Sequence, residues 1–312
     1  MKATIIGHKG FVGKNLIDIL KKTVEIRGLS KSTGFNLEKA FFSDEQVSIL
    51  KNCDFIINCA ANVGSLNYVS EQAADVLDSN TRIIINLYKT LRNISSKAVV
   101  INPIANCGYP GSLALYREEE FWNGPIHDSV LSYGTSRRFL VTISRCYEKQ
   151  YGIKSLNYFV PNMYGENDSV DSNKAHALNA LINKFYIAAK HQKPEVTVWG
   201  TGKPVREWLY AKDFAKIILQ TMKRYIDGET FSESINIGQK YGISITDLVK
   251  IIVPIVNYSG QVIYDTSKQD GAPVKIMDNK LFIKKFPDFH FTSFQEGITN
   301  TLHYYTSILS VS

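Results

Sequence analysis

Three glycines spaced three residues apart separate a short apolar run from an amphipathic one near the start of the chain. Residues 3–6 form the apolar run, Gly7, Gly10 and Gly13 follow, and apolar side chains then recur with helical spacing as far as Leu20. Glycines so placed allow a tight turn, close packing of a helix on a strand, and close approach of the backbone to a pyrophosphate. The pattern predicts a strand, a turn and a helix whose N-terminus faces a dinucleotide. A turn that serves packing alone is the alternative.

Strand-like runs and helix-length segments alternate along the first half of the chain. The strand-like runs lie at 24–29, 55–58, 98–101 and 156–160, and the helix-length segments include 70–92 and 133–150. Alternation of this kind is typical of an α/β protein. It predicts a Rossmann-type, doubly wound parallel sheet with helices on both faces.

The pattern becomes less regular after Val160, where a second, smaller α/β domain is expected to begin. We expect a dinucleotide-binding domain over 1–165, which the helical segment at about 210–235 rejoins, and a substrate-binding domain over 166–312. A helix is predicted near 176–191.

Composition favours a protein of the cytoplasm with no membrane partner. The 312 residues are 44% hydrophobic, yet no apolar run approaches the roughly 20 residues that span a bilayer. The net charge of +7 comes from scattered cations. It argues against a nucleic-acid-binding face and fits either a solvated surface or a phosphate-bearing ligand. The four cysteines show no zinc-site spacing, so we expect no metal.

The end of the second predicted strand bears on which dinucleotide is bound. A carboxylate there would bond the ribose 2′-hydroxyl of NAD and repel the 2′-phosphate of NADP. The chain has Ser30 and Lys31 instead, and Lys9 adds a cation in the glycine turn. These groups suit a 2′-phosphate through charge-assisted hydrogen bonds, so NADP(H) is favoured over NAD(H). The alternative is that Lys9 and Lys31 are merely solvated.

Several motifs occur along the chain in one order. They are "IIGHKGFVG" at 5–13, "NCAANVGS" at 58–65, Tyr133 with a cation four residues later, "PNMYGENDSVD" at 161–171, "VWGTGKPVREWLYAKDFA" at 198–215, "INIG" at 235–238 and "YDTSKQDGAPVK" at 264–275. Together they resemble the extended short-chain dehydrogenase/reductases of the NAD-dependent epimerase/dehydratase family, most closely those that act on a GDP-4-keto-6-deoxy-mannose. The resemblance covers nearly the whole chain. It implies NADPH as reductant and a homodimer joined through the helices near 70–92 and 133–150.

The resemblance also implies which residues bind ligands. Those implied for the cofactor are Gly7, Lys9, Gly10, Phe11, Val12, Gly13, Ser30, Lys31, Ala60, Ala61, Tyr133, Arg137, Pro161, Asn162 and Met163. Those implied for a nucleotide-diphosphate sugar, with a GDP-sugar favoured, are Asn162, His176, Lys184, Trp199, Arg206, Lys268 and Asp270. Arg206 can neutralise a diphosphate and Trp199 can pack on a base. Val274 stands where the family has another cation, which bears on the identity of the base or sugar.

Reduction of a ketone by a nicotinamide requires a proton for the developing alkoxide. In the family a tyrosine supplies it, and a lysine four residues later holds the nicotinamide ribose and lowers the pKa of the tyrosine. Tyr133 matches the tyrosine, but Arg137 replaces the lysine on the same helix face. Arginine keeps the charge but is planar, longer and unable to release its proton. We therefore expect partial activation of Tyr133 with altered geometry.

Epimerisation next to the ketone requires one group that removes a proton and another that returns it on the opposite face. The resemblance assigns these roles to Cys107 and His176, whose side-chain types exchange protons near neutral pH. Ala105 replaces a serine that would bond the substrate carbonyl, and Asn106 is the candidate donor beside it. A buried small thiol and a surface imidazole are the ordinary alternatives for the pair.

Three functions are compatible with these residues. The first is an NADP-dependent nucleotide-sugar epimerase/reductase that acts on a GDP-4-keto-6-deoxy-hexose or a related 4-keto sugar. The second is an enzyme that retains only one step, because Ala105 and Arg137 alter the reduction apparatus while Cys107 and His176 are kept. The third is a non-catalytic regulatory protein that binds a dinucleotide at a degenerate site.

Overall fold

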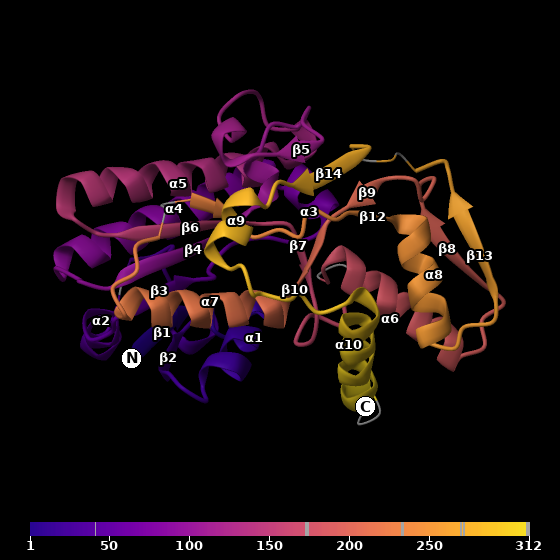
Figure 1. Cartoon of the computed structure of the whole chain (residues 1–312), viewed down its shortest axis with the longest axis horizontal. Helices are drawn as coiled ribbons and strands as arrows, with labels where there is room; N and C mark the ends of the chain where they lie inside the picture. Colours follow the sequence, from indigo (N-terminus) through magenta and orange to yellow (C-terminus); the bar gives the residue numbers. More distant parts are fainter. Residues whose placement is uncertain (41, 172–174, 232–233, 269, 271, 310–312) are drawn as a thin grey trace.

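The centre of the protein is a parallel sheet of six strands in the order β11-β6-β4-β3-β1-β2 (Figure 1). The computed structural model describes residues 1–40, 42–171, 175–231, 234–268, 270 and 272–309, so Gln269 and Gly271 of the last motif lie outside the described residues. The six strands are β1 (Lys2–Ile6), β2 (Glu25–Leu29), β3 (Phe55–Asn58), β4 (Val99–Ala105), β6 (Ser155–Val160) and β11 (Ser234–Asn236). The predicted Rossmann-type sheet is confirmed, and its strand order reverses direction between β1 and β3.

Helices cover both faces of the sheet. α1 (Phe11–Leu20) and α7 (Ala211–Ile226) pack on one face. α4 (Ala73–Asn93), α5 (Leu131–Tyr151) and the short α2 (Asp44–Lys51) pack on the other. Both faces are therefore buried, as is usual for parallel sheets.

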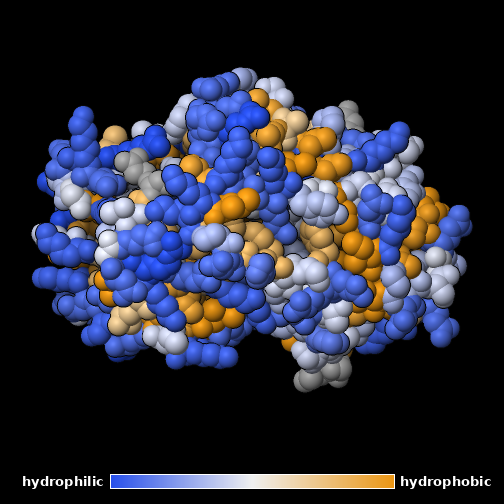
Figure 2. Space-filling model, viewed as in Figure 1, coloured by the Kyte–Doolittle hydropathy of each residue, from blue (hydrophilic) through white to orange (hydrophobic). Residues whose placement is uncertain are grey.

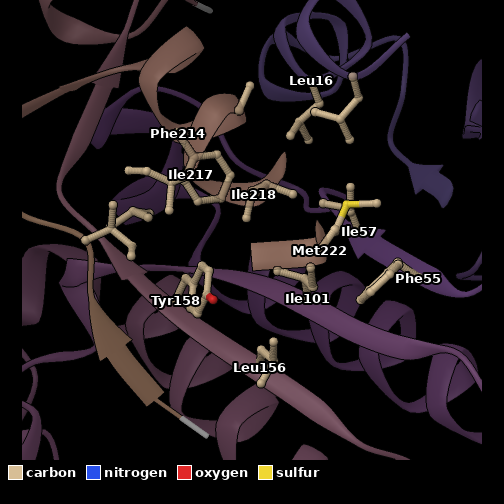
Figure 3. Packing of buried hydrophobic residues seen from close by; sticks show 14 of the residues in the cluster. Leu16, Phe55, Ile57, Ile101, Leu156, Tyr158, Phe214, Ile217, Ile218 and Met222 are labelled. Atoms are coloured by element: carbon tan, nitrogen blue, oxygen red, sulfur yellow. The ribbon is translucent and has the colours of Figure 1, made fainter. Parts of the chain in front are cut away.

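Successive strand residues enter opposite cores because side chains alternate along a strand. Ile57 and Ile101 contribute to the core under α1 and α7, where they meet Phe214 and Met222 (Figure 3). Their neighbours Ile56 and Val100 enter the core under α4 and α5.

A row of three asparagines interrupts the apolar pattern on the α4–α5 face. Asn102 of β4 is in register with Asn157 of β6, and Asn58 ends β3 beside it. The Asn58 Nδ2 donates to Asn102 Oδ1 at 3.1 Å, and Asn102 Nδ2 donates to Asn157 Oδ1 at 3.0 Å. Asn157 Nδ2 donates in turn to Ser144 Oγ of α5 at 3.0 Å. The row fixes the register of three strands, because a slip by one residue would bury amides without partners.

A second core lies at the opposite end of the molecule from β2 (Figure 1). Three helices, α6 (Ala177–Lys190), α8 (Ile245–Ile255) and α10 (Phe294–Leu309), pack around it. The parallel pair β8 (Glu195–Trp199) and β13 (Gln261–Asp265) closes its outer side.

Two smaller sheets bring segments from both halves of the chain together. One contains β12 (Ile243–Ser244), β9 (Val205–Arg206), β14 (Val274–Met277) and β5 (Leu115–Tyr116), in that order. The other pairs β7 (Asn162–Tyr164) with β10 (Trp208–Tyr210) in parallel. The short helix α9 (Lys280–Lys285) follows β14. β14 therefore lies between a strand of the first half and a strand of the second.

The single helix predicted over 70–92 is wrong, because two helices occupy this part of the chain. α3 (Leu66–Glu71) ends at Gln72, whose φ of −103° and ψ of 35° leave the helical conformation before α4 begins. The hydroxyl of Ser65 caps α3 by accepting a hydrogen bond from the Tyr68 N–H at 3.3 Å. This cap starts the first helix earlier than the apolar spacing indicates.

Polar side chains dominate the molecular face drawn in Figure 2, and apolar side chains form separate patches on it. Within the described part of the chain, none of the helices has the length and hydropathy of a membrane-spanning segment. Trp199 is the most exposed large apolar side chain among the described residues, at 66%.

We predict that Gly7→Ala destabilises the protein by about 2–5 kcal/mol in urea unfolding. Gly7 has a φ of 82°, and a Cβ there would lie 2.9 Å from the Cys59 carbonyl carbon and oxygen. The left-handed conformation costs an alanine about 1–2 kcal/mol, and overpacking adds about 1–3 kcal/mol.

Gly228→Ala is the matched control for this variant. Gly228 has a φ of 91°, and a Cβ there meets no atom within 4 Å. Its loss is therefore expected to be about 1–2 kcal/mol. Equal losses for the two variants would contradict a steric role for the contact with Cys59.

Candidate active site

The glycine turn forms a cradle at the reversal point of the sheet. The Gly7 N–H donates to Leu29 O at 2.7 Å, and the Gly10 N–H donates to Gly7 O at 2.9 Å. A Cβ on Gly13 would lie 2.4 Å from Gly7 O, so only glycine permits this approach of α1 to the turn. Gly10 caps α1 without a side chain, which leaves the first amides of the helix accessible to an anion. The cradle fits a pyrophosphate.

Hydroxyl groups gather at the end of β2, where the adenosine end of a dinucleotide is expected. Ser30 Oγ lies 3.1 Å from Ser32 Oγ and 3.2 Å from Thr33 Oγ1. Lys31 Nζ donates to both carboxylate oxygens of Glu38 at 3.2 Å. The lysine side chain is 68% exposed and that of Glu38 is 29% exposed. Ser79 Oγ also donates to Glu38 at 2.9 Å, so Glu38 is held in place while the exposed Lys31 is accessible to a phosphate. Lys9 is also exposed.

Tyr133 and Arg137 lie one above the other on α5. The Arg137 guanidinium carbon is 4.7 Å from the centre of the Tyr133 ring, and Arg137 itself is only 3% exposed. Burial raises the pKa of the Tyr133 hydroxyl, while the arginine charge lowers it. The arginine charge thus acts on the Tyr133 pKa in the direction that was expected of the lysine.

Asn80 of α4 holds the far side of the guanidinium. Arg137 Nη2 donates to Asn80 Oδ1 at 3.0 Å, and Asn80 Nδ2 donates to the Asn62 carbonyl at 2.8 Å and to the Val76 carbonyl at 2.7 Å. The Asn62 N–H returns a bond to Asn80 Oδ1 at 3.1 Å. Arg137 therefore links the helix of Tyr133 to the loop that follows β3, through a forked group that lysine lacks.

Cys107 lies in the short 3₁₀ turn η2 (Asn106–Gly108), directly after β4. A Cβ on Gly134 would lie 2.5 Å from the Cys107 carbonyl oxygen, so α5 approaches this turn closely at the residue after Tyr133. Burial raises the pKa of the Cys107 thiol to about 11, while the charges of Arg137 and Lys275 oppose this shift. The thiol is consequently protonated at neutral pH.

The two residues before Cys107 differ in what they offer to a substrate. Ala105 ends β4 opposite Val160 and has no polar side-chain atom. Asn106 is 9% exposed, and its backbone carbonyl accepts from the Tyr109 N–H at 3.0 Å. Asn106 is thus the one polar side chain of this pair at the turn.

Lys275 joins this cluster and was not among the predicted site residues. It is paired with Arg206 between β14 and β9, and Met277 of β14 is paired with Tyr116 of β5. Side chains of paired residues point to the same face of a sheet, so the two cations and Tyr116 share one face. Burial and the Arg206 charge lower the pKa of the Lys275 ammonium, and Cys107 raises it. Two half-buried cations side by side favour a polyanionic ligand.

His176 lies at the N-terminus of α6, next to the glycine turn. Its ring centre is 4.8 Å from that of Phe11, the first residue of α1. Its Nδ1 is 3.1 Å from Asp168 Oδ1, and its backbone N–H donates to Asp168 Oδ2 at 2.8 Å. The described contacts place His176 beside the cofactor cradle and on a different element from Cys107.

The remaining predicted residues divide into two groups. Pro161 and Met163 are buried at the end of β6 and in β7, and Asn162 between them is exposed. Ala60 and Ala61 follow β3 and are partly buried; Val12, in the first turn of α1, packs against the core under α1 and α7.

The outer group lies around β8. Lys268 Nζ lies 5.9 Å from the Trp199 ring centre. Asp270 accepts from the Thr201 N–H at 2.9 Å and from its hydroxyl at 2.5 Å, which lowers the pKa of this carboxyl. Lys184 donates to the Thr197 carbonyl of β8 at 2.5 Å. These contacts tie Lys184 and Asp270 to the protein and leave Trp199 open to a ligand.

Sequence reasoning missed Asn80, Asp168 and Lys275. Asp168 and Lys275 lie inside motifs that resemble the family, but nothing in their spacing indicates a contact with His176 or Cys107. Asn80 lies on a helix with no distinguishing signal.

Comparison with known proteins finds one family and several relatives of nearly the same length. The model of the NAD dependent epimerase/dehydratase family matches residues 3–238. GDP-L-fucose synthase of Dictyostelium discoideum is 28% identical over 306 residues, which cover 96% of this chain and 94% of that protein. GDP-L-colitose synthase of Yersinia pseudotuberculosis is 27% identical over 310 residues, with 98% of each chain covered.

Solved structures give the same result. The crystal structure of a GDP-L-fucose synthetase from Naegleria fowleri bound to NADP superimposes with a TM-score of 0.86 at 25% identity, and covers 100% of this chain and 94% of that one. Similarity therefore extends through both cores of the fold.

We predict that iodoacetamide at pH 7 alkylates Cys146 and leaves Cys107 essentially unmodified. Cys146 is exposed, whereas the pKa of about 11 keeps the Cys107 thiol protonated at pH 7. When the pH lies about four units below the pKa, only about 1 thiol in 10⁴ is ionised to the reactive thiolate. Peptide mass mapping over time gives both rates, and the Cys107 rate should keep rising to the highest pH tested. Equal rates at pH 7 would mean that the local cations overcome the effect of burial.

Proposed function

The chain belongs to the NAD dependent epimerase/dehydratase family, and within it we propose an NADP-dependent enzyme that epimerises and reduces a GDP-linked 4-keto-6-deoxy-hexose or a related 4-keto sugar. The observation that carries the proposal is the cluster of Tyr133, Arg137 and Cys107 at the carboxyl end of β4. The proposal includes a homodimer joined through α4 and α5 and a cytoplasmic location.

The choice of cofactor and substrate class draws on the relatives and on the residues. Near full-length relatives are named GDP-L-fucose synthase and GDP-L-colitose synthase, and a similar structure contains NADP. The glycine cradle suits the pyrophosphate, and Ser30, Lys31 and Lys9 suit a 2′-phosphate. The bound nicotinamide would supply the hydride.

Tyr133 donates the proton that the C4 alkoxide needs during reduction. Arg137 keeps a positive charge over its ring, which favours the tyrosinate left after proton transfer. The same guanidinium can donate to ribose hydroxyls while Asn80 holds its other side. Asn106 is the remaining side-chain donor for the substrate carbonyl, because Ala105 has none.

Cys107 and His176 exchange the protons at C3 and C5. The ketone at C4 acidifies both positions, and the two side chains come from different elements, η2 and the N-terminus of α6, so the proposal assigns one to each face of the sugar. Tyr133 is the donor available to stabilise the developing enolate oxygen.

Arg206 and Lys275 bind the diphosphate of the nucleotide sugar. Their side chains share one sheet face next to Cys107, and binding an anion there relieves the repulsion between two partly desolvated cations. Trp199, with 66% of its surface exposed, packs on the base or ribose.

The test uses purified protein, NADPH and GDP-4-keto-6-deoxy-mannose in deuterated water. Loss of nicotinamide absorbance together with deuterium at C3 and C5 is expected. Deuterium without absorbance loss would restrict the protein to epimerisation, and absorbance loss without deuterium would restrict it to reduction. Neither signal would reject the proposal for this substrate and favour a non-catalytic dinucleotide-binding protein.

We predict opposite effects for two variants in this assay. Tyr133→Phe should lower the rate of absorbance loss at least about 100-fold. It should slow deuterium exchange less, because exchange loses one hydrogen bond to the enolate oxygen and keeps both proton-transfer groups. Cys107→Ser should suppress exchange, because a hydroxyl is a far weaker acid than a thiol. Undiminished exchange in Cys107→Ser would reject the cysteine's role.

A further prediction concerns the arginine. Arg137→Lys should keep hydride transfer within about tenfold of wild type, because the charge is kept, and lower the free energy of unfolding by about 1–3 kcal/mol, because the fork to Asn80 is lost. Arg137→Met removes the charge as well and should slow hydride transfer about 100-fold. Single-turnover absorbance and urea unfolding measure the two effects; full activity in Arg137→Met would show that the charge is dispensable.

A further inference from the structure

Asp168 is a buried carboxylate that contacts His176 twice. Its side chain is 3% exposed, whereas that of His176 is 40% exposed. Asp168 Oδ1 lies 3.1 Å from His176 Nδ1, and Asp168 Oδ2 accepts from the His176 backbone N–H at 2.8 Å. One carboxylate therefore holds both the main chain and the ring of the same residue.

These contacts determine which ring nitrogen carries the proton. A carboxylate accepts hydrogen bonds and donates none, so the Nδ1 facing it must be the protonated nitrogen. The lone pair of the neutral ring is then on Nε2. A free neutral imidazole prefers the other tautomer, in which Nε2 carries the hydrogen, so the carboxylate reverses the intrinsic preference.

Packing fixes the ring in this orientation. The Phe11 ring lies against the imidazole at 4.8 Å between centres and an interplanar angle of 42°. Rotation about the Cβ–Cγ bond would exchange the Nδ1 contact for a carbon and leave Asp168 Oδ1 without its ring partner. The buried carboxylate would then lose a bond in a place where water cannot easily replace it.

We propose that Asp168 is a positioning residue that fixes the His176 tautomer and orients Nε2 as the atom that exchanges a proton with the sugar carbon. This inference rests on the proposed function, because it assigns His176 to the exchange at C3 or C5. Nε2 removes a proton as a free base and returns one after protonation. In both steps Nδ1 keeps its hydrogen, which remains in a hydrogen bond to Asp168. No net proton is consumed over the cycle.

A purely structural carboxylate would give a different outcome from a positioning one. If Asp168 only fixed the main chain before α6, it would need the hydrogen bond from the His176 N–H but not the contact with the imidazole Nδ1. The variant Asp168→Asn separates the two roles, because the amide oxygen can still accept from the backbone while the amide NH₂ can donate to Nδ1. Donation to Nδ1 would place the hydrogen on Nε2 and block its action as a base.

The first test reads the tautomer directly. Long-range ¹H–¹⁵N correlation spectra of full-length protein with ¹⁵N-labelled histidine, at a pH where the ring is neutral, report which nitrogen carries hydrogen. The chain has six histidines, and His176→Asn identifies the signals of His176 by their absence. Wild type should show hydrogen on Nδ1, and Asp168→Asn should shift it to Nε2. Hydrogen on Nε2 in wild type, or no change in Asp168→Asn, would overturn the proposal.

The second test measures the consequence for exchange. In the deuterium assay with GDP-4-keto-6-deoxy-mannose, Asp168→Asn should slow exchange about 100-fold at the same carbon that His176→Asn affects, and Asp168→Glu should recover part of the rate. Asp18→Asn is the matched control, because Asp18 accepts from Asn167 Nδ2 at 3.1 Å in the same region. Asp18→Asn should catalyse deuterium exchange at the wild-type rate.

The outcomes separate this inference from the proposed function. Exchange in wild type together with an unchanged rate in Asp168→Asn would overturn the role of Asp168 and leave the proposed function intact. No exchange in wild type would reject the proposed function for this sugar, and the tautomer spectra would still decide whether Asp168 positions the ring. Thermal unfolding checks that Asp168→Asn folds. If it does not, Asp168→Ala takes its place in both tests, because it also leaves Nδ1 without a carboxylate acceptor and should allow hydrogen to move to Nε2.

Discussion

The close approach of three backbone segments at the carboxyl ends of β1 and β3 is the constraint on which the site depends. Gly7 lies against the Cys59 carbonyl on one side and admits Gly13 of α1 on the other, at distances that exclude any Cβ. This packing directs the N-terminus of α1 into the space at the reversal point of the sheet. Phe11 then follows directly and meets His176, so a turn that cradles phosphate also helps to place a proposed catalytic side chain.

The sequence was sufficient to predict those features that local patterns determine. The strand-like runs at 24–29, 55–58 and 156–160 correspond to β2, β3 and β6 to within one residue. The central strand β3 is buried along its whole length and reads as an apolar run, whereas the more exposed β2 alternates polar and apolar residues. The glycine spacing predicted the cradle because residues without a Cβ are what a tight turn and close packing of a helix on a strand require. Tyr133 and Arg137 were correctly expected to share a helix face, since residues four apart do so.

Features created by tertiary contact were not predictable in this way. The amide of Asn80 meets the guanidinium of Arg137 across 57 positions of sequence, and no periodicity encodes such a pairing. Lys275 reaches the site because β14 inserts between β5 and β9, and Asp168 is defined by the fold of the loop before α6. From the sequence alone, arginine in place of lysine predicts only altered geometry beside Tyr133. The structure shows in addition that the Arg137 Nη2 group has its own acceptor, the Asn80 side-chain oxygen.

The asparagine row across β3, β4 and β6 has a consequence for how this chain can diverge. Every amide in the row donates in the same direction, from Asn58 through Asn102 and Asn157 to Ser144. An apolar residue at the middle position would leave a donor on one side and an acceptor on the other, both buried. Recombination that exchanges β4 alone with a homologue of apolar pattern is therefore disfavoured. Exchange of the three strands together with both α4 and α5 keeps every partner of the row, because Tyr88 of α4 also accepts from Asn102 Nδ2 at 3.0 Å.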